Sequence, residues 1–178
     1  MASFSDAHEC DEIPIIAANM HRMILPRQSQ IWAVVKAGQP LQKLYYQICS
    51  GLLGRLCFSG EPDALSAAQW TVMDEGTAFY GKAASIIDHG VSQRFGPRIV
   101  SYRAPRGWQA VVRRGETQTL VVVHTFGAAP EAVTLPVGGK IAAQFMREGL
   151  TATHLDGQLT VHGLTDFDAA AFILENEG

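Results

Sequence analysis

The stretch from Leu65 to Gly90 constrains the fold most, because it carries the strongest helix signal in the chain. Its apolar residues recur at helical spacing and mark one face: Leu65, Ala68, Val72, Phe79, Ala83 and Ile86. Ser66 and Gln69 have the spacing of an N-terminal capping box, and Gly90 stands where a left-handed residue would end the last turn. Before this helix, helical and strand-like segments alternate. After it, almost every segment has the pattern of a strand.

The composition narrows the classes of protein. Of 178 residues 47% are hydrophobic, which is normal for a globular protein, and a net charge of −3 gives no overall attraction to nucleic acid or membranes. No apolar run approaches the roughly 20 residues of a membrane helix. The cysteines are odd in number, without paired spacing: Cys10, Cys49 and Cys57. We therefore expect a reduced, cytoplasmic protein, and no cofactor.

The first half has the βα alternation of a parallel sheet or barrel. A short strand-like segment, residues 2–5, precedes a helix that Asp11 can cap. Two continuous apolar runs, Ile31 to Val35 and Leu52 to Phe58, have the pattern of strands buried on both faces, with a short helix beginning at Leu41 between them. Three such units are too few to close a barrel, so this half is expected to belong to a larger structure.

The second half contains short strand candidates separated by Gly, Pro and Asp-Gly turns. They are Val100 to Tyr102, Gln109 to Arg113, Gln118 to Thr125, Ala132 to Val137, Ile141 to Arg147, Gln158 to Val161 and Ala169 to Leu174. This spacing predicts a small antiparallel β-sandwich of about seven strands. The expected fold class is therefore α/β followed by all-β, divided between residues 1–93 and residues 94–178.

A polar cluster directly after the first strand-like segment is the best candidate for chemistry: Asp6, His8, Glu9, Cys10 and Asp11. In enzymes built on an α/β barrel, the loops that follow the strands carry the catalytic groups. Carboxylates before a helix also complement the helix dipole, so the cluster alone leaves both interpretations open. His8 and Cys10 would suit a metal, but no second ligand pair lies at zinc spacing, and we expect no metal site.

Other polar and aromatic residues favour structural roles. Cys49 and Cys57 lie in apolar segments and are expected to be inert core thiols, and His124 a hydrogen-bonded sheet residue. Trp108 could stack on a sugar ring or, more simply, cover the sandwich. Six of the 14 basic residues fall between Arg94 and Arg114. They could suit a nucleic-acid strand, but no RNA-recognition or OB motif accompanies them, and exposed strand faces or a domain interface explain them better.

Four segments occur in an order that resembles a known enzyme family. They are FSD (Phe4 to Asp6), LPRQSQIWAVV, SGLLGRLCFSG and LSAAQW. The order resembles the end of the catalytic barrel of family 36 α-galactosidases, which are clan D glycoside hydrolases. The residues from about Gly96 are placed like the antiparallel β domain that follows that barrel. One departure is Ala7, where the family has asparagine after the aspartate.

The resemblance implies a partial (β/α)8 barrel followed by a β-sandwich, with Asp6 as the general acid/base of a retaining glycosidase. The family's nucleophile lies on an earlier strand in a Lys-Trp-Asp motif, which this sequence lacks. The chain would then be a C-terminal fragment, inactive alone. Its substrate would be an α-galactoside, and its partner the N-terminal part of the same enzyme.

Two further expectations follow. Uncovered strand edges and apolar faces would make the isolated chain poorly soluble or homo-oligomeric. The alternative function, from a different class, is a non-catalytic carbohydrate-binding or assembly module that uses the sandwich and Trp108.

Overall fold

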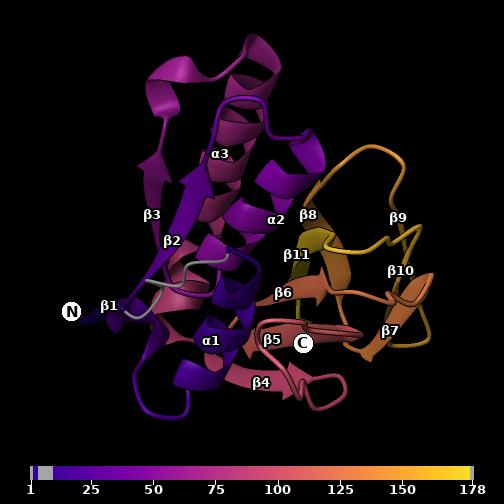
Figure 1. Cartoon of the computed structure of the whole chain (residues 1–178). Helices are drawn as coiled ribbons and strands as arrows, with labels where there is room; N and C mark the ends of the chain where they lie inside the picture. The colour runs from indigo at the N-terminus through magenta and orange to yellow at the C-terminus, as the bar shows by residue number, and fades with distance from the viewer. Residues whose placement is uncertain (1, 4–9, 177–178) are drawn as a thin grey trace.

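The computed structural model of the chain describes residues 2–3 and 10–176, which form three sheets and three α-helices (Figure 1). The helices are α1 (Ile13–Met20), α2 (Leu41–Gly51) and α3 (Ala67–His89), with 3-10 turns η1 (Cys10–Glu12), η2 (Pro26–Gln28) and η3 (Pro62–Ala64). The strands are β1 (Ala2–Ser3), β2 (Ser29–Val35), β3 (Arg55–Gly60), β4 (Val91–Phe95), β5 (Trp108–Arg114), β6 (Gln118–Thr125), β7 (Ala132–Pro136), β8 (Lys140–Met146), β9 (Thr151–Leu155), β10 (Gln158–His162) and β11 (Ala169–Glu175).

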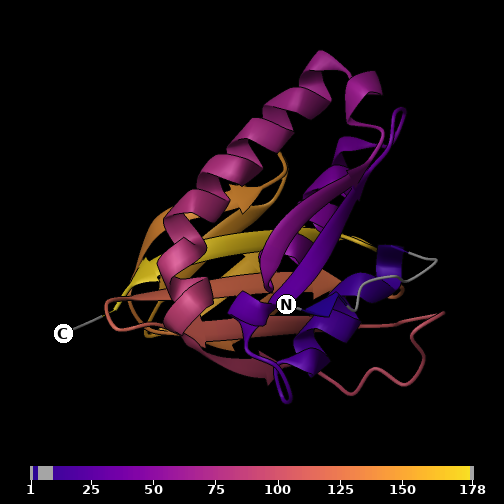
Figure 2. The same ribbon diagram turned by 90° about the vertical axis from the view of Figure 1, so that its left-hand side faces the viewer.

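The elements stack in layers. A parallel sheet of order β1-β2-β3 packs on the helices, and the helices pack on an antiparallel sheet of order β4-β5-β6-β11-β8 (Figures 1 and 2). A second antiparallel sheet, of order β7-β10-β9, covers the other face of the five-stranded sheet. The structure is therefore mixed α/β in its first half and antiparallel β in its second.

Strand β6 shows how one short sequence serves two cores. Leu120 and Val122 point into a core shared with the helices, whereas Val121 and Val123 point into the core between the two antiparallel sheets. Successive side chains of a strand face opposite sides of the sheet, so a run of consecutive apolar residues is what a strand between two cores requires. Ile31 of β2 belongs to the same core as Leu120, so the helices join the parallel sheet to the antiparallel part.

The predicted capping box at the start of α3 is confirmed. The amide of Gln69 donates to Ser66 Oγ at 3.3 Å, and the Ser66 amide donates to Gln69 Oε1 at 3.0 Å. The prediction for Gly90 is wrong, because its φ of −74° lies in the extended region. Glycine is needed there for a close approach instead. A Cβ atom at Gly90 would lie 2.6 Å from the Ile86 carbonyl oxygen and 2.7 Å from Cγ of Arg113.

Neither of the two strands predicted to be buried on both faces is fully buried. Along β2 fully buried residues alternate with partly exposed ones, among them Trp32 and Val34. Strand β3 begins at Arg55 and has no fully buried residue. The run from Leu52 instead completes the turn after α2, where the Leu52 amide donates to the Ile48 carbonyl at 3.1 Å. A continuous apolar run does not distinguish the end of a buried helix from a strand.

The antiparallel part differs from prediction at its edges. Residues 100–102 form no strand, and Val100 is 90% exposed in the loop between β4 and β5. Edge strands β4 and β9 were not predicted, because neither carries a row of inward apolar side chains. Pairing with β5 and β10 forms them instead. The predicted Asp-Gly turn joins β9 to β10, with φ of 50° at Asp156 and 71° at Gly157, as a tight hairpin requires.

Two glycines inside α3 provide a matched test of packing. A Cβ at Gly76 would lie 2.7 Å from Cγ2 of Ile48 on α2, whereas a Cβ at Gly81 would have no other atom within 4 Å. We expect Gly81→Ala to raise the free energy of unfolding by about 1 kcal/mol through helix propensity. We expect Gly76→Ala to lower it by about 1–3 kcal/mol through overpacking. Urea unfolding of both variants measures the difference, and a stabilised Gly76→Ala protein would contradict the close packing of α2 on α3.

Candidate functional site

The polar cluster predicted to carry chemistry falls partly outside the described residues. Asp6, His8 and Glu9, with the preceding Phe4 and Ser5, lie in the segment that the structure does not describe. The described residues next to this segment are Ser3, at the end of β1, and Cys10, at the start of η1. Because β1 pairs with β2 in parallel, with Ser3 opposite Gln30, the predicted strand before Asp6 is confirmed for its first two residues.

Asp11, the third acid of the cluster, is engaged by α2. Its carboxylate forms an ion pair with Nζ of Lys43, and its carbonyl oxygen accepts a hydrogen bond from the Tyr46 hydroxyl at 2.9 Å. The prediction that Asp11 caps α1 is therefore wrong. Glu12 occupies the N-cap position and makes no side-chain capping bond. Lys43 and Asp11 are 25% and 31% exposed, so the pair lies at the surface, where it fastens η1 to α2.

Two aromatic rings surround the ammonium group of Lys43. The Nζ atom lies 5.0 Å from the ring centroid of Tyr46 and 5.8 Å from that of Phe167, within the range of a cation–π interaction. Burial, followed by the charge of Asp11, raises the pKa of the Tyr46 hydroxyl well above its usual value, so the hydroxyl stays a donor. Phe167 has a φ of 55°, a left-handed conformation that bulky residues rarely adopt.

The loop between β10 and β11 holds Phe167 in this conformation. Nε2 of Gln42 on α2 donates to Thr165 Oγ1 at 3.1 Å and to the Asp166 carbonyl at 2.9 Å. On the other side of Phe167, the buried carboxylate of Asp168 accepts two bonds from Arg147 at 2.6 and 3.0 Å. The first turn of α2 and the end of the antiparallel part are thus joined beside the residues that lead into η1.

The expectations for Trp108 and the core thiols have mixed outcomes. Trp108 is half-buried and packs against the core between the antiparallel sheets, as the structural interpretation expected. Cys49 is fully buried, and burial raises the pKa of its thiol well above the usual value. The expectation for Cys57 is wrong. It is only partly buried and lies opposite Trp32 in the register of β3 with β2.

His124 is fully buried, and its Nε2 lies 3.2 Å from Oγ of Ser50. Its Nδ1 atom has no hydrogen-bond partner among the described residues, so the expected bonding holds for one ring nitrogen. Burial lowers the pKa of His124 to about 3, and the ring is therefore neutral at physiological pH.

Neither a cluster of metal-ligating side chains nor a membrane-spanning helix occurs in the described part of the chain. No three His, Cys, Asp or Glu side chains gather there as a metal ion would need. None of the helices that the structure describes combines the length and apolar character of a transmembrane helix.

Neither a family model nor a curated protein matches the sequence, but solved structures match the fold. The α-galactosidase from Lactobacillus brevis superposes on 98% of this chain with a TM-score of 0.69 and 10% identity. The galactosidase domain of the α-galactosidase-sucrose kinase AgaSK superposes on 97% of this chain, with a TM-score of 0.65 and 14% identity. The chain has the fold of the C-terminal region of GH36 α-galactosidases.

The GH36 likeness covers nearly all of this chain but only part of its neighbours. The chain spans 26% of the Lactobacillus brevis chain and 25% of the AgaSK domain. A variant of the GH36 α-galactosidase AgaA from Geobacillus stearothermophilus, solved in complex with raffinose, matches 97% of this chain at 12% identity with a TM-score of 0.65. The chain covers 25% of that protein.

Proposed function

We propose that the chain is the C-terminal part of a retaining α-galactosidase-like glycoside hydrolase. Residues 1–93 would form the end of its catalytic (β/α)8 barrel and residues 94–178 its C-terminal antiparallel β domain. The observation that carries the proposal is the match of 97–98% of the chain to about a quarter of GH36 enzymes. Parallel strands with helices on one face are also what the last units of a barrel provide.

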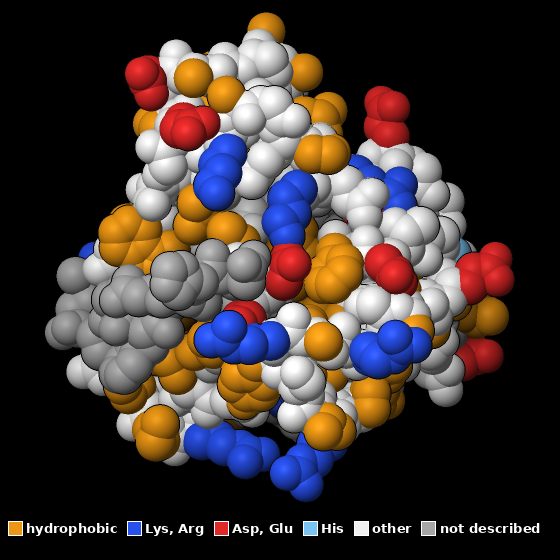
Figure 3. All heavy atoms as spheres, viewed as in Figure 1, with side chains coloured by type: hydrophobic (Ala, Val, Ile, Leu, Met, Phe, Trp, Pro, Cys, Tyr) orange, Lys and Arg blue, Asp and Glu red, His pale blue; other side chains and the backbone are white. Residues whose placement is uncertain are grey.

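The incomplete burial of one face of the parallel sheet supports this assignment. Trp32, Val34 and Cys57 lie on the side of the sheet opposite Ile31 and the helices, and all three are only partly buried. Apolar side chains are visible on this side of the molecule, beside the undescribed residues (Figure 3). In a closed barrel this face points inward and is covered by side chains from the other strands.

Asp6 is the proposed acid/base. It follows β1 by three residues in sequence, and loops after barrel strands place catalytic groups. Of the two nearby acids, Asp11 is already paired with Lys43, which favours a structural role for it. A retaining glycosidase needs a second carboxyl group about 5–5.5 Å from the first. The family's Lys-Trp-Asp motif is absent from the sequence, so the chain alone is expected to lack the nucleophile and to be inactive.

The proposed substrate is an α-galactoside or a related oligosaccharide. The support is indirect: one matched GH36 structure holds raffinose and another holds stachyose. The proposed partner is the remaining N-terminal part of the same enzyme, which would pack on the partly buried face of β2 and β3. Without it we expect the chain to be poorly soluble or to associate with itself.

Expression of the chain alone and of a product extended upstream tests the proposal. We expect no hydrolysis of an aryl α-galactoside by the chain alone, because one carboxyl group cannot complete the double displacement. We expect the extended product to hydrolyse it with retention of configuration and to sediment as a defined species. Activity of the chain alone would contradict the proposal. An upstream sequence that supplies no nucleophile would favour the non-catalytic carbohydrate-binding or assembly module.

A further inference from the structure

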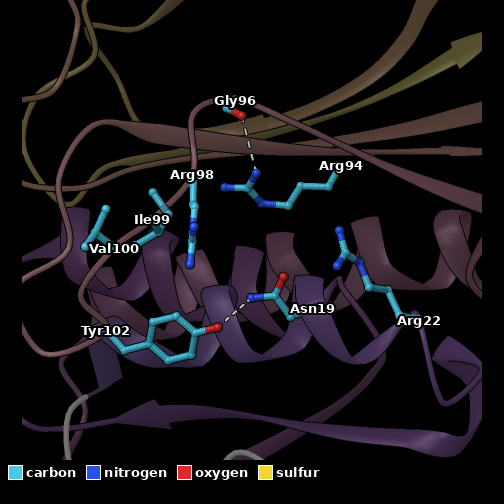
Figure 4. Close-up of a pocket in the computed structure, with 8 residues that line it drawn as sticks. All are labelled: Asn19, Arg22, Arg94, Gly96, Arg98, Ile99, Val100 and Tyr102. Carbon is cyan, nitrogen blue, oxygen red and sulfur yellow. Dashed lines mark hydrogen bonds between the residues drawn. The ribbon is translucent and has the colours of Figure 1, made fainter.

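A basic pocket lies at the C-terminal end of α1, where this helix meets the loop between β4 and β5. The cavity has a volume of about 710 Å³ and is lined by three arginines and two other polar side chains. These are Arg22, Arg94, Arg98, Asn19 and Tyr102. Figure 4 shows the side chain of Arg94 reaching toward Gly96 and that of Arg98 extending toward α1, while Asn19 on α1 and Arg22 just after it extend toward the same hollow. Helix and loop thus converge on one basic site.

Local bonds fix the shape of this pocket. Arg94 donates to the carbonyl oxygens of Gly96 at 3.3 Å and Pro97 at 2.7 Å, which holds the chain that leads to Arg98. Nδ2 of Asn19 donates to the Tyr102 hydroxyl at 2.8 Å and joins α1 to the far side of the loop. These contacts explain why residues 100–102 are not a strand: the loop folds back on α1 instead.

The charge of the pocket is not neutralised within the described part of the chain. No carboxylate lines it, and the side chains of Arg22 and Arg98 form no ion pair there. Burial, followed by the like charge of Arg22, lowers the pKa of Arg94. The carbonyl end of α1 offsets only part of this charge, because a helix terminus carries about half an elementary charge.

A fourth arginine, Arg113, is hydrogen-bonded to a residue that lines a neighbouring cavity. Arg113 is 1% exposed and donates to the Leu53 carbonyl at 2.7 Å and to Ser92 Oγ at 2.9 Å. Its Nη1 atom has no hydrogen-bond partner among the described residues. Ser92 and His21 line a smaller cavity of about 160 Å³ that shares Arg22 and Arg94 with the basic pocket.

The titratable neighbours add no counter-charge. Burial, followed by the charge of Arg113, lowers the pKa of His21 to about 3, so this ring is neutral. Burial lowers the pKa of Arg113 only to about 10, and the group stays cationic at neutral pH. A buried cation without a carboxylate is costly unless another anion compensates it.

We propose that this pocket binds a phosphate-class oxyanion, either inorganic phosphate or a small phosphate monoester. Guanidinium groups match the geometry of phosphate oxygens, and several of them converging on a hollow is how proteins hold this group. The Asn19 amide and the Tyr102 hydroxyl supply polar contacts for the organic part of an ester. The site lies at the end of α1 opposite Asp11, and the proposal does not depend on the proposed hydrolase function.

Calorimetric titration of the full chain with inorganic phosphate and with glycerol phosphate tests the proposal. We expect saturable binding of at least one, weakened roughly tenfold or more in Arg22→Gln/Arg98→Gln, because hydrogen bonds to charged groups are strong. Tighter binding of the ester would identify an organophosphate, and equal binding would identify the free ion. Arg55→Gln/Arg103→Gln is the matched control, since it changes the net charge equally and both residues are exposed outside the pocket. Thermal unfolding should show that all variants remain folded.

Three outcomes would overturn the proposal. The first is the absence of saturable binding at low ionic strength. The second is an equal loss in both double variants, which would indicate a general charge effect. The third is tighter binding of citrate or of a glutamate-rich peptide than of either phosphate, which would identify a carboxylate ligand instead.

Discussion

Asp6→Asn in the intact parent enzyme is expected to lower turnover of galactosides with poor leaving groups by roughly 10²–10⁴-fold. The acid/base must be protonated to assist the leaving group and then deprotonated to activate water. Asparagine can do neither. Galactosides with activated aryl leaving groups should be affected less in the first step, because their departure needs no proton. Added azide should restore release from the glycosyl-enzyme, because it attacks without a base.

Glu9→Gln and Asp11→Asn are the controls, measured on both substrate types with and without azide. Asp11→Asn should remove only the partly exposed pair with Lys43, which is worth about 0–1 kcal/mol of stability, and should show no dependence on the leaving group. If Glu9→Gln shows that dependence while Asp6→Asn resembles the wild type, the acid/base is Glu9. If no variant matters, the assignment to this enzyme class fails.

Asp168→Asn is expected to lower the free energy of unfolding by about 3–5 kcal/mol, the usual cost of removing one partner of a buried ion pair. The carboxylate of Asp168 is fully buried. Besides Arg147 it accepts from the Ala169 amide at 3.0 Å and from the Thr165 hydroxyl at 3.2 Å. An amide in its place directs a donor toward the guanidinium group. Because domains are stable by only about 5–15 kcal/mol, this variant should be visibly less stable in urea unfolding.

Asp166→Asn gives the matched control two residues away. Asp166 is exposed, and its oxygen accepts from the Ala129 amide at 2.8 Å, a bond that asparagine can keep. Its effect should stay within about 0.5 kcal/mol. Arg147→Met should lower the free energy of unfolding nearly as much as Asp168→Asn. The two losses should not add in the double variant, because both substitutions remove the same ion pair. Equal small effects at both aspartates would show that the pair does not hold the loop.

Local sequence signals predicted the elements whose causes are local. The capping box, the long α3 and the buried run of β6 could all be read from neighbouring residues. Edge strands β4 and β9 could not, because they owe their conformation to partners rather than to their own apolar residues. Arg113 also escaped prediction. An arginine in a strand pattern indicates an exposed face, yet this one is buried beside the turn that follows α2.

The surroundings of the candidate site depended on contacts that no short-range pattern reveals. Gln42 is hydrogen-bonded to Thr165, which is 123 positions away in the sequence, and Lys43 is bonded to Asp11, which is 32 positions away. Asp6 itself could be predicted only by resemblance to a family, and it lies outside the described residues. Its role therefore remains a proposal. For the basic pocket, the sequence showed the density of arginines from Arg94 onward but not that Arg94 and Arg98 line one cavity with Arg22.

The helical layer has a consequence for how the protein can be divided. Helices α2 and α3 contribute to a single core with β2 on one side and with β6 and β11 on the other. The boundary drawn at residues 93 and 94 falls within β4, beyond the helices but inside the five-stranded sheet. Exchange of the antiparallel part between homologues would therefore have to carry the complementary faces of α2 and α3 with it. A recombinant that keeps α2 and α3 should therefore keep both the parallel sheet and the five-stranded sheet that pack against them.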